Sequence, residues 1–229
     1  MTHYGLAHLA DRIRHWSRWH LEPIALALLR PGVRVRLLDL GVALVPEDLA
    51  RSSITSYTIG VGEDIDFERR LASLGEARQW LFDPTPRAVA FMGEPGNGLP
   101  RAQFLPLGIW ERDQKMWFNA PANDGQVSHS ITEASSSDAG FEAECRSPRS
   151  VMTMLGHDRV DLVKMNIEGA EDVVLRSMLD AGIHPRCIIC TWEGRGALHK
   201  ALAWTRLLRA KGWNLCGRKG WYFTYLRAS

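Results

Sequence analysis

The sequence predicts an α/β domain built on a mostly parallel sheet with helices on both faces. From residue 56 onward, short segments rich in β-branched and aromatic residues alternate with longer segments of helical periodicity. A glycine turn joins the first such strand to the first helix, and the last fifteen or so residues have the pattern of a hairpin. With 229 residues, 45% of them hydrophobic, the chain is long enough to bury a sizeable core.

Two kinds of segment are expected before residue 50. Residues 6–29 carry apolar side chains at intervals typical of one or two amphipathic helices, which Pro31 and Gly32 end. Val33–Leu37 alternates with period two and predicts a short strand, and Pro46–Leu49 predicts a brief helical turn. We therefore expect an N-terminal helical extension that packs on the main domain.

The regular part of the chain predicts five strands and four helices before a terminal hairpin. The strands are Ser56–Gly60, Gln79–Asp83, Gln103–Leu107, Val160–Asn166 and Cys187–Glu193. The helices are Phe67–Leu74, Pro86–Met92, Ala170–Ala181 and Leu198–Lys211. Strands separated by helices indicate a parallel sheet with right-handed crossovers. The hairpin, Trp213–Arg218 with Trp221–Leu226, is expected at the sheet edge because Lys219 and Gly220 form its turn.

A long polar segment interrupts this alternation. Residues 108–158 lie between the third and fourth strands and are too polar to suggest core structure. We expect an inserted loop region here, with Glu133–Asp138 as a mobile loop because it is rich in serine and aspartate. The expected division is thus residues 1–50 as the extension and 51–229 as the main domain.

The first candidate site follows the first strand. Gly60 and Gly62 let the backbone turn sharply and approach a ligand, and Asp83 ends the next strand, where a carboxylate can bridge a ribose diol. This order predicts a pocket for an adenosine-containing cofactor. A surface turn without a ligand is the alternative, because Gly-x-Gly alone is a weak signal.

Glu63 and Asp64 favour one cofactor class over another. Two carboxylates beside a diphosphate would repel it, whereas S-adenosyl-L-methionine carries a sulfonium and an ammonium that they would attract. A methyltransferase is therefore the main hypothesis. An NAD(P)-dependent oxidoreductase is the alternative, although it would need a turn that tolerates phosphate, and a non-catalytic cofactor-binding protein is another.

A second polar cluster follows the fourth strand. Lys164, Asn166 and Glu168 alternate with Met165 and Ile167, so the three polar side chains share one face of a strand expected to be buried. Because unpaired burial costs several kcal/mol, they should meet a ligand or one another. The alternative is an internal ion pair of Lys164 with Glu168 or Glu171.

The four cysteines, Cys145, Cys187, Cys190 and Cys216, are expected to be buried free thiols. Cys187 and Cys190 lie three apart on a predicted strand, so they point to opposite faces and could not share a metal ion.

Composition sets the expected surroundings of the protein. The formal net charge of +2 comes without a concentrated basic stripe, so nucleic acid is not expected as a partner. The longest apolar runs are too short for a membrane span, and no secretory leader is recognised, so we expect a cytoplasmic protein. Whether it forms a homo-oligomer is left open.

Several motifs together resemble one protein family. They are Tyr57-Thr-Ile-Gly-Val-Gly-Glu-Asp-Ile, Phe82-Asp-Pro-Thr-Pro86, Pro106-Leu-Gly-Ile-Trp110, Val127-Ser-His-Ser-Ile131, Gly156-His-Asp-Arg159 and Asp161-Leu-Val-Lys-Met-Asn-Ile-Glu-Gly-Ala-Glu171. In order and spacing they look like the FkbM family of S-adenosylmethionine-dependent methyltransferases, over about residues 40–227. The resemblance implies a class I methyltransferase (Rossmann-like) fold with a seven-stranded sheet, whose final hairpin inserts one antiparallel strand. It also implies methylation of a hydroxyl oxygen.

The resemblance assigns roles to particular residues. Gly60, Gly62 and Glu63 would hold the methionine portion of the cofactor and Asp83 its ribose. Gly108, Ile109 and Trp110 would lie near the adenine. Each role is implied by the motifs that these residues match.

Two positions depart from the family pattern. The family generally has aspartate where this chain has Asn166, which can hydrogen-bond to the cofactor ammonium or to a substrate hydroxyl but cannot take a proton. The chain also has Thr191-Trp-Glu-Gly-Arg195 where relatives carry a Glu-Phe-His-like sequence, so contacts with the substrate here could differ.

Methyl transfer to an alcohol requires that the hydroxyl lose its proton. His129 is the candidate base, with Glu168 and Glu193 as alternatives. No dedicated acidic cluster predicts a metal site, although oxygen ligands from Glu168, Asn166 and Glu193 would suit Mg²⁺, so a divalent metal is left open. The expected acceptor is a small molecule or a sugar-like secondary metabolite.

Overall fold

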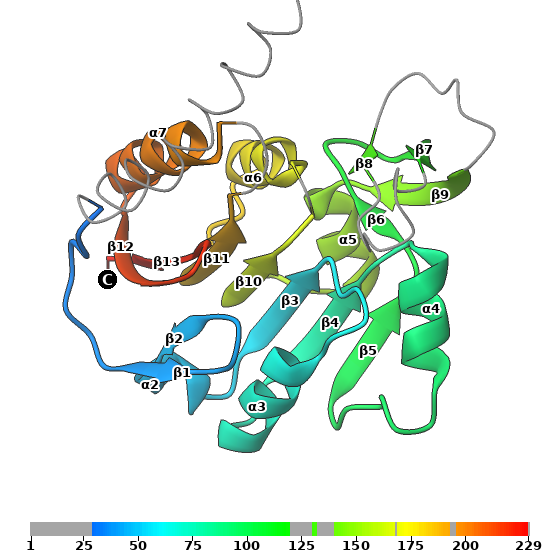
Figure 1. The fold of residues 1–229 in the computed structure, drawn as a ribbon, viewed down its shortest axis with the longest axis horizontal. Helices are drawn as coiled ribbons and strands as arrows, with labels where there is room; N and C mark the ends of the chain where they lie inside the picture. Colours follow the sequence, from blue (N-terminus) through cyan, green and yellow to red (C-terminus); the bar gives the residue numbers. More distant parts are fainter. Residues whose placement is uncertain (1–28, 120–129, 132–139, 168, 193–195, 229) are drawn as a thin grey trace, which may run out of the picture.

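The computed structural model describes residues 29–119, 130–131, 140–167, 169–192 and 196–228. Its centre is a seven-stranded sheet in the order β12-β13-β11-β10-β3-β4-β5 (Figure 1). The strands are β3 (Thr55–Ile59), β4 (Arg78–Phe82), β5 (Ala102–Leu105), β10 (Leu162–Met165), β11 (Cys187–Thr191), β12 (Trp213–Lys219) and β13 (Tyr222–Arg227). Strands β5, β4, β3, β10 and β11 are parallel, and β13 runs antiparallel to β11 and β12. The predicted α/β fold is confirmed, including the reversed strand.

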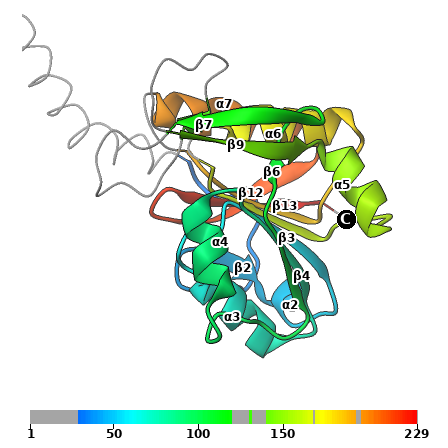
Figure 2. The same ribbon diagram turned by 90° about the vertical axis from the view of Figure 1, so that its right-hand side faces the viewer.

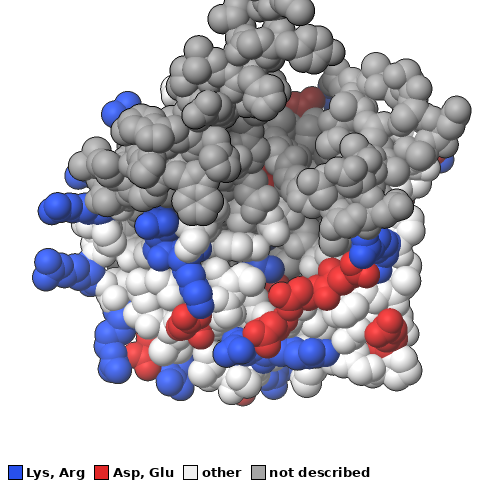
Figure 3. All heavy atoms as spheres, in the orientation of Figure 1, with Lys and Arg blue, Asp and Glu red and all other residues white. Residues whose placement is uncertain are grey.

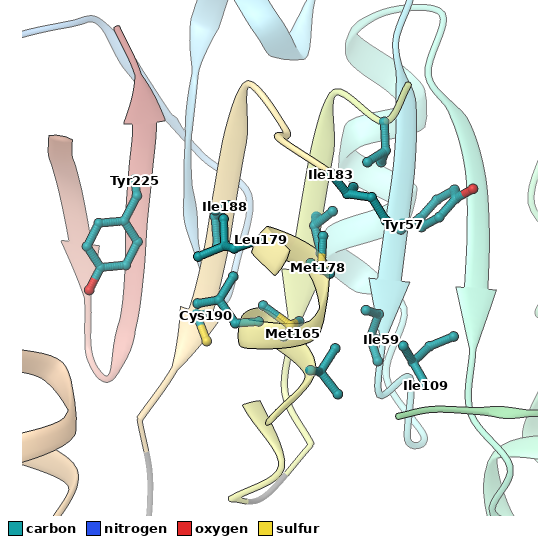
Figure 4. Close-up of a cluster of buried hydrophobic side chains, with 14 of the residues drawn as sticks. Tyr57, Ile59, Ile109, Met165, Met178, Leu179, Ile183, Ile188, Cys190 and Tyr225 are labelled. Carbon is teal, nitrogen blue, oxygen red and sulfur yellow. The ribbon is translucent and has the colours of Figure 1, made fainter. Parts of the chain in front are cut away.

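Helices cover both faces of this sheet. The helices are α2 (Glu47–Ala50), α3 (Asp66–Leu74), α4 (Pro86–Gly93), α5 (Pro148–Leu155), α6 (Glu171–Asp180) and α7 (Ala197–Ala210). One core layer joins α5, α6 and α7 to the sheet, and the layer on the other face contains α2 and α3. In Figure 4, Ile188 and Cys190 of β11 and Met165 of β10 gather around Met178 and Leu179 of α6. The expected helices match these bounds to within one or two residues.

The period-two alternation of the strands decides which side chain enters which layer. On β11, Cys187 and Ile189 lie in the α2 and α3 layer, whereas Ile188 and Cys190 lie in the α6 and α7 layer. All four cysteines are free and buried, as predicted. Burial raises the pKa of the Cys145 thiol to about 11 and that of Cys216 to about 12, and it raises those of Cys187 and Cys190 as well.

The described part of the N-terminal region consists of a hairpin and one short helix. Strand β1 (Leu37–Asp39) pairs antiparallel with β2 (Leu44–Pro46), so the strand expected over Val33–Leu37 begins four residues later. The short helix α2 follows, close to the predicted helical turn. The hairpin packs against the end of the sheet, where the Lys219 ammonium lies 2.6 Å from the Asp39 carboxylate. The helices expected over residues 6–29 lie almost entirely outside the described residues, and the division at residue 50 stays a prediction.

The inserted region was wrongly predicted to be a loop. It contains a second sheet in the order β6-β9-β7-β8, followed by α5. Its strands are β6 (Gly108–Ile109), β7 (Gln114–Asn119), β8 (Ser130–Ile131) and β9 (Gly140–Arg146). Figure 2 shows β7 and β9 as a layer at the same end of the molecule as α6 and α7.

Alternation explains why these polar residues form strands. Met116 and Phe118 of β7 pack with Cys145 of β9, while Lys115 and Glu142 lie on the solvent side, where they form a 2.8 Å ion pair. A sheet that buries only one face needs only every second residue to be apolar. The Ser/Asp-rich piece, Glu133–Asp138, lies outside the described residues. In the part of the chain that the structure describes, no helix combines the length and apolar content needed to cross a bilayer.

Candidate cofactor-binding site

A cavity of about 270 Å³ opens at the carboxyl ends of β3, β4 and β10. Ligands of open α/β sheets bind at this edge. The lining residues form four groups: Ile59, Gly60, Val61, Gly62, Glu63 and Asp64; Phe82, Asp83, Pro84 and Thr85; Gly108, Ile109 and Phe118; and Asn166, Ile167 and Ala170. The structure therefore brings together the glycine turn, the acidic strand end and Asn166, whereas Lys164 of the same polar cluster is not among the lining residues.

The glycine turn requires its glycines for two different reasons. Gly60 has a φ of +86°, and a Cβ atom there would lie 2.0 Å from the backbone oxygen of Asn166. The loop therefore packs directly on the end of β10, at a distance that any side chain would prevent. Gly62 has a φ of +61°, but a Cβ atom there would meet nothing within 4 Å, so only its backbone conformation favours glycine.

Asp83 lies in the wall of the cavity, 5% exposed, where it holds the loop. Its Oδ2 accepts hydrogen bonds from the backbone N–H groups of Val61 and Gly62, both at 2.9 Å. Its Oδ1 accepts from the N–H of Thr85 at 2.9 Å and from the Thr85 hydroxyl at 2.7 Å. A carboxylate has about four acceptor positions, so these donors occupy all of them. Its predicted contact with a ribose stays a prediction and requires one of these bonds to be exchanged.

Glu63 and Asp64 lie at the mouth of the cavity. The Glu63 carboxylate forms a 2.6 Å ion pair with Arg87 of α4, and Oδ1 of Asp64 accepts from the N–H of Asp66 at 2.8 Å. Figure 3 shows acidic side chains in a row over the turn between β3 and α3, with basic side chains at both ends of the row. Exposed ion pairs contribute little to stability, so we attribute to this row an effect on the local potential rather than on the fold.

Asn166 is held by neighbours on two other strands. Its Nδ2 donates to the Tyr222 hydroxyl and its Oδ1 accepts from the Thr191 hydroxyl, each at 3.0 Å. Thr191 also lies 3.3 Å from the buried Glu171 carboxylate, which accepts from the N–H of Ile167 at 3.0 Å. These bonds fix the amide at the edge of the cavity and the backbone that follows it.

Sequence reasoning did not select Tyr222. It reaches Asn166 because β13 runs antiparallel beside β11, which places the start of β13 opposite Thr191. The one available signal was the hairpin itself, since the reversed strand implied by the family resemblance brings its first residue to the carboxyl edge of the sheet.

Lys164 forms an internal ion pair, which was the alternative interpretation, but with a residue that the sequence analysis did not name. Its ammonium lies 3.1 Å from the carboxylate of Glu68, on α3, instead of pairing with Glu171. Glu171 is used locally, because it accepts hydrogen bonds from the backbone of the turn that precedes α6. Glu168, the other expected partner, lies outside the described residues.

The second sheet supplies one wall of the cavity. Gly108 and Ile109 line it as predicted, whereas Trp110 is not among the described lining residues and packs against the apolar core. A Cβ atom at Gly108 would lie 2.5 Å from the sulfur of Cys145, so glycine permits the close contact between β6 and β9. Phe118, which sequence reasoning missed, also lines the cavity and stacks on Phe141 with ring centroids 5.2 Å apart.

The candidate catalytic residues His129, Glu168 and Glu193 all lie outside the described residues, so their roles stay predictions. Within the described ranges, no group of three or more histidine, cysteine, aspartate or glutamate side chains could hold a metal ion. The described residues thus supply a cavity, a glycine loop and an acidic mouth.

No protein-family model matches the chain, and no curated protein matches it either. Among solved structures, it is similar to precorrin-6y C5,15-methyltransferase from Geobacter metallireducens, with 11% identity and a TM-score of 0.45 over 80% of this chain and 85% of that one. It is also similar to the fibrillarin pre-rRNA processing protein of Methanococcus jannaschii, with 9% identity and a TM-score of 0.44 over 82% and 71% of the two chains. A putative RNA methyltransferase from Pyrococcus horikoshii has 12% identity and a TM-score of 0.40 over 91% and 99%. At these values the similarities carry no argument about substrate or mechanism.

Proposed function

We propose that this protein is a methyltransferase that uses S-adenosyl-L-methionine to methylate a hydroxyl oxygen of a small, sugar-like acceptor, and that it belongs to the FkbM family. The observation that carries the proposal is a cavity at the carboxyl edge of the sheet with a tight glycine loop and two carboxylates at its mouth. The order of the strands and the reversed β13 agree with the fold that the family resemblance implies.

The loop disfavours a diphosphate cofactor. Dinucleotide-binding loops present free backbone N–H groups to phosphate oxygens. Here the N–H groups of Val61 and Gly62 are already bonded to Asp83, and the Glu63 and Asp64 carboxylates lie beside them. A ligand that carries a sulfonium and an ammonium suits this arrangement better than NAD does.

The lining residues divide by chemistry along the cavity. Phe82, Pro84, Ile109 and Phe118 provide apolar surface suited to a flat base. The turn from Gly60 to Glu63, with Asn166 opposite, provides polar groups for the methionine end. Asp83 follows the glycine turn and precedes Ile109 in the sequence, and it also lines the cavity. The cofactor, when bound, would supply an electrophilic methyl group.

The remaining task of the protein is to align the acceptor and to exclude water, because the cofactor supplies the chemistry. A base must also remove the hydroxyl proton, and His129 is the proposed base, with Glu168 and Glu193 as alternatives. Asn166 would orient a ligand through hydrogen bonds, since an amide cannot accept a proton in this role.

Isothermal titration calorimetry with S-adenosylmethionine tests the cofactor, and a parallel titration with NADH tests the alternative. We expect heat of binding with the first ligand and none with the second. An absence of binding at millimolar S-adenosylmethionine, or saturable binding of NADH, contradicts the proposal. Formation of S-adenosylhomocysteine with candidate alcohols then separates an enzyme from a protein that only binds the cofactor.

A further inference from the structure

A cluster of buried polar side chains lies between α3 and the main sheet. It consists of Ser56 and Thr58 of β3, Gln79 of β4, Lys164 of β10 and Glu68 of α3, each of them at most 5% exposed. We call this group the Glu68 cluster. Polar side chains so deeply buried are normally hydrogen-bonded, so each of their donors and acceptors needs a partner.

The Glu68 carboxylate is the centre of the cluster. Its Oε1 accepts a hydrogen bond from the Thr58 hydroxyl at 2.7 Å and from the Lys164 ammonium at 3.1 Å. The side-chain nitrogen of Gln79 donates to the backbone oxygen of Glu68 at 3.0 Å. Helix α3 is therefore tied to three neighbouring strands through one residue.

Three atoms of the cluster have no hydrogen-bond partner among the described residues. They are Oε2 of Glu68, Oε1 of Gln79 and the hydroxyl oxygen of Ser56. Ser56 and Gln79 are direct neighbours in the parallel ladder of β3 and β4, and Gln79 contacts Glu68. The three atoms therefore belong to one connected group under α3. Leaving a buried polar atom unpaired costs about 1–3 kcal/mol, so three of them in one place require an explanation.

We propose that the Glu68 cluster binds an internal water molecule that joins these three atoms. The water would donate one hydrogen to Glu68 Oε2 and the other to Gln79 Oε1, and it would accept the hydrogen of the Ser56 hydroxyl. The count is complete, because two acceptors and one donor use both hydrogens and one lone pair of a single water. Three hydrogen bonds is also the usual number for a buried water.

The composition of the cluster favours water over a cation. The Lys164 ammonium already neutralises the Glu68 carboxylate at 3.1 Å, and it would repel a metal ion bound to the other oxygen of that carboxylate. A water molecule that donates a hydrogen bond to that second oxygen is neutral, so the ammonium does not repel it.

This water would lie behind the candidate cofactor site. Thr58 lies on β3 just before Ile59 and the glycine turn, and Lys164 lies on β10 two residues before Asn166. The cluster therefore supports the strand ends at the cavity. The water would complete the attachment of α3, the helix that follows the glycine turn, to those strands. The site does not depend on which cofactor binds.

A crystal structure of the protein at about 1.5 Å resolution tests the proposal directly. We expect an ordered water within hydrogen-bond distance of Glu68, Gln79 and Ser56. A dry contact between these side chains, or density with the coordination of a metal ion, overturns it.

The Ser56→Ala variant provides a test in solution whose sign differs between the alternatives. If the water is present, the variant loses one hydrogen bond to it, and the equilibrium constant for unfolding in urea should rise about fivefold. If the site is dry, the variant removes an unsatisfied hydroxyl, so the constant should stay the same or fall. Ser73→Ala is the matched control, because the Ser73 hydroxyl is exposed on α3 and its loss should change the constant less than twofold. An unchanged or lower constant for Ser56→Ala overturns the proposal.

Discussion

Replacing Asp83 by asparagine tests how far the glycine loop depends on one carboxylate. Asparagine keeps the size of the side chain but has one acceptor oxygen and one NH₂ group, so two of the four donors around Asp83 must face NH₂. The less costly orientation points NH₂ at Thr85, whose hydroxyl can rotate to accept a hydrogen bond. The N–H of Thr85 cannot rotate and loses its partner.

The expected loss of stability follows from these contacts. The bonds to the N–H groups of Val61 and Gly62 lose their charge-assisted character, at about 1 kcal/mol each, and the unpaired N–H of Thr85 adds about 1–3 kcal/mol. We therefore expect Asp83→Asn to lower the free energy of unfolding by about 3–5 kcal/mol, measured by urea titration. Asp64→Asn is the control, because the exposed Asp64 accepts a single N–H at the mouth of the cavity, and its effect should be within about 0.5 kcal/mol. A loss below about 1 kcal/mol for Asp83→Asn would refute the reasoning.

The same variant separates the structural role of Asp83 from its predicted contact with ribose. If the carboxylate also binds the cofactor, Asp83→Asn, and more so Asp83→Ala, should weaken the affinity for S-adenosylmethionine by about 1–3 kcal/mol in calorimetry at a temperature where the variant is folded. A dissociation constant equal to that of the unmodified protein, together with the loss of stability, would assign Asp83 to the loop alone.

Three further predictions concern the packing around the site. Gly60→Ala should lower the free energy of unfolding by about 3 kcal/mol or more in urea titration and should abolish cofactor binding. The control Gly156→Ala, at a φ of +68° with open space around it, should lower it by only about 1 kcal/mol, and equal effects would contradict the close contact at Gly60. Lys164→Met should lower the free energy of unfolding by about 3–5 kcal/mol, because it leaves the Glu68 carboxylate buried and unpaired, and adding Glu68→Leu should recover most of this stability. If the effects of the two substitutions simply add in the double variant, the two residues do not interact. The four buried cysteines, whose thiol pKa values are raised, should not react with a thiol reagent at pH 8 until urea unfolds the protein, and rapid labelling of the native state would contradict their burial.

Local sequence patterns were sufficient for the main sheet and its helices. Runs such as Leu162–Met165 and Cys187–Thr191 are apolar enough to be buried on both faces, which is typical of central parallel strands. The glycine turn and Asp83 could also be placed at the cavity, because parallel strands present their carboxyl ends at one edge.

The second sheet could not be predicted in the same way. Its strands are short, and β9 carries a charged residue at every second position (Glu142, Glu144 and Arg146), so the apolar side chains between them form no continuous run. The pairing of β7 with β9 joins residues more than twenty positions apart, and only the folded chain reveals it.

Long-range contacts also explain what was missed at the site. Phe118, Tyr222 and Glu68 reach their positions through strand order and helix packing. Glu68 and its partner Lys164 are 96 residues apart in the sequence. Nothing in the neighbourhood of Lys164 could indicate Glu68, whereas the nearby Glu171 was an obvious but incorrect candidate.

The walls of the cavity come from β3, β4, β6, β7 and the segment that follows β10, which are scattered over more than a hundred residues, so the cavity disappears when the chain unfolds. A small molecule that fits it can therefore bind only the native form and must raise the melting temperature by mass action. Each tenfold increase of the ligand concentration above its dissociation constant adds about 1.4 kcal/mol to the free energy of unfolding. A thermal-shift screen detects this stabilisation without any knowledge of the reaction. The same screen, applied to metabolite collections in the presence of a saturating cofactor, offers a direct route to the acceptor.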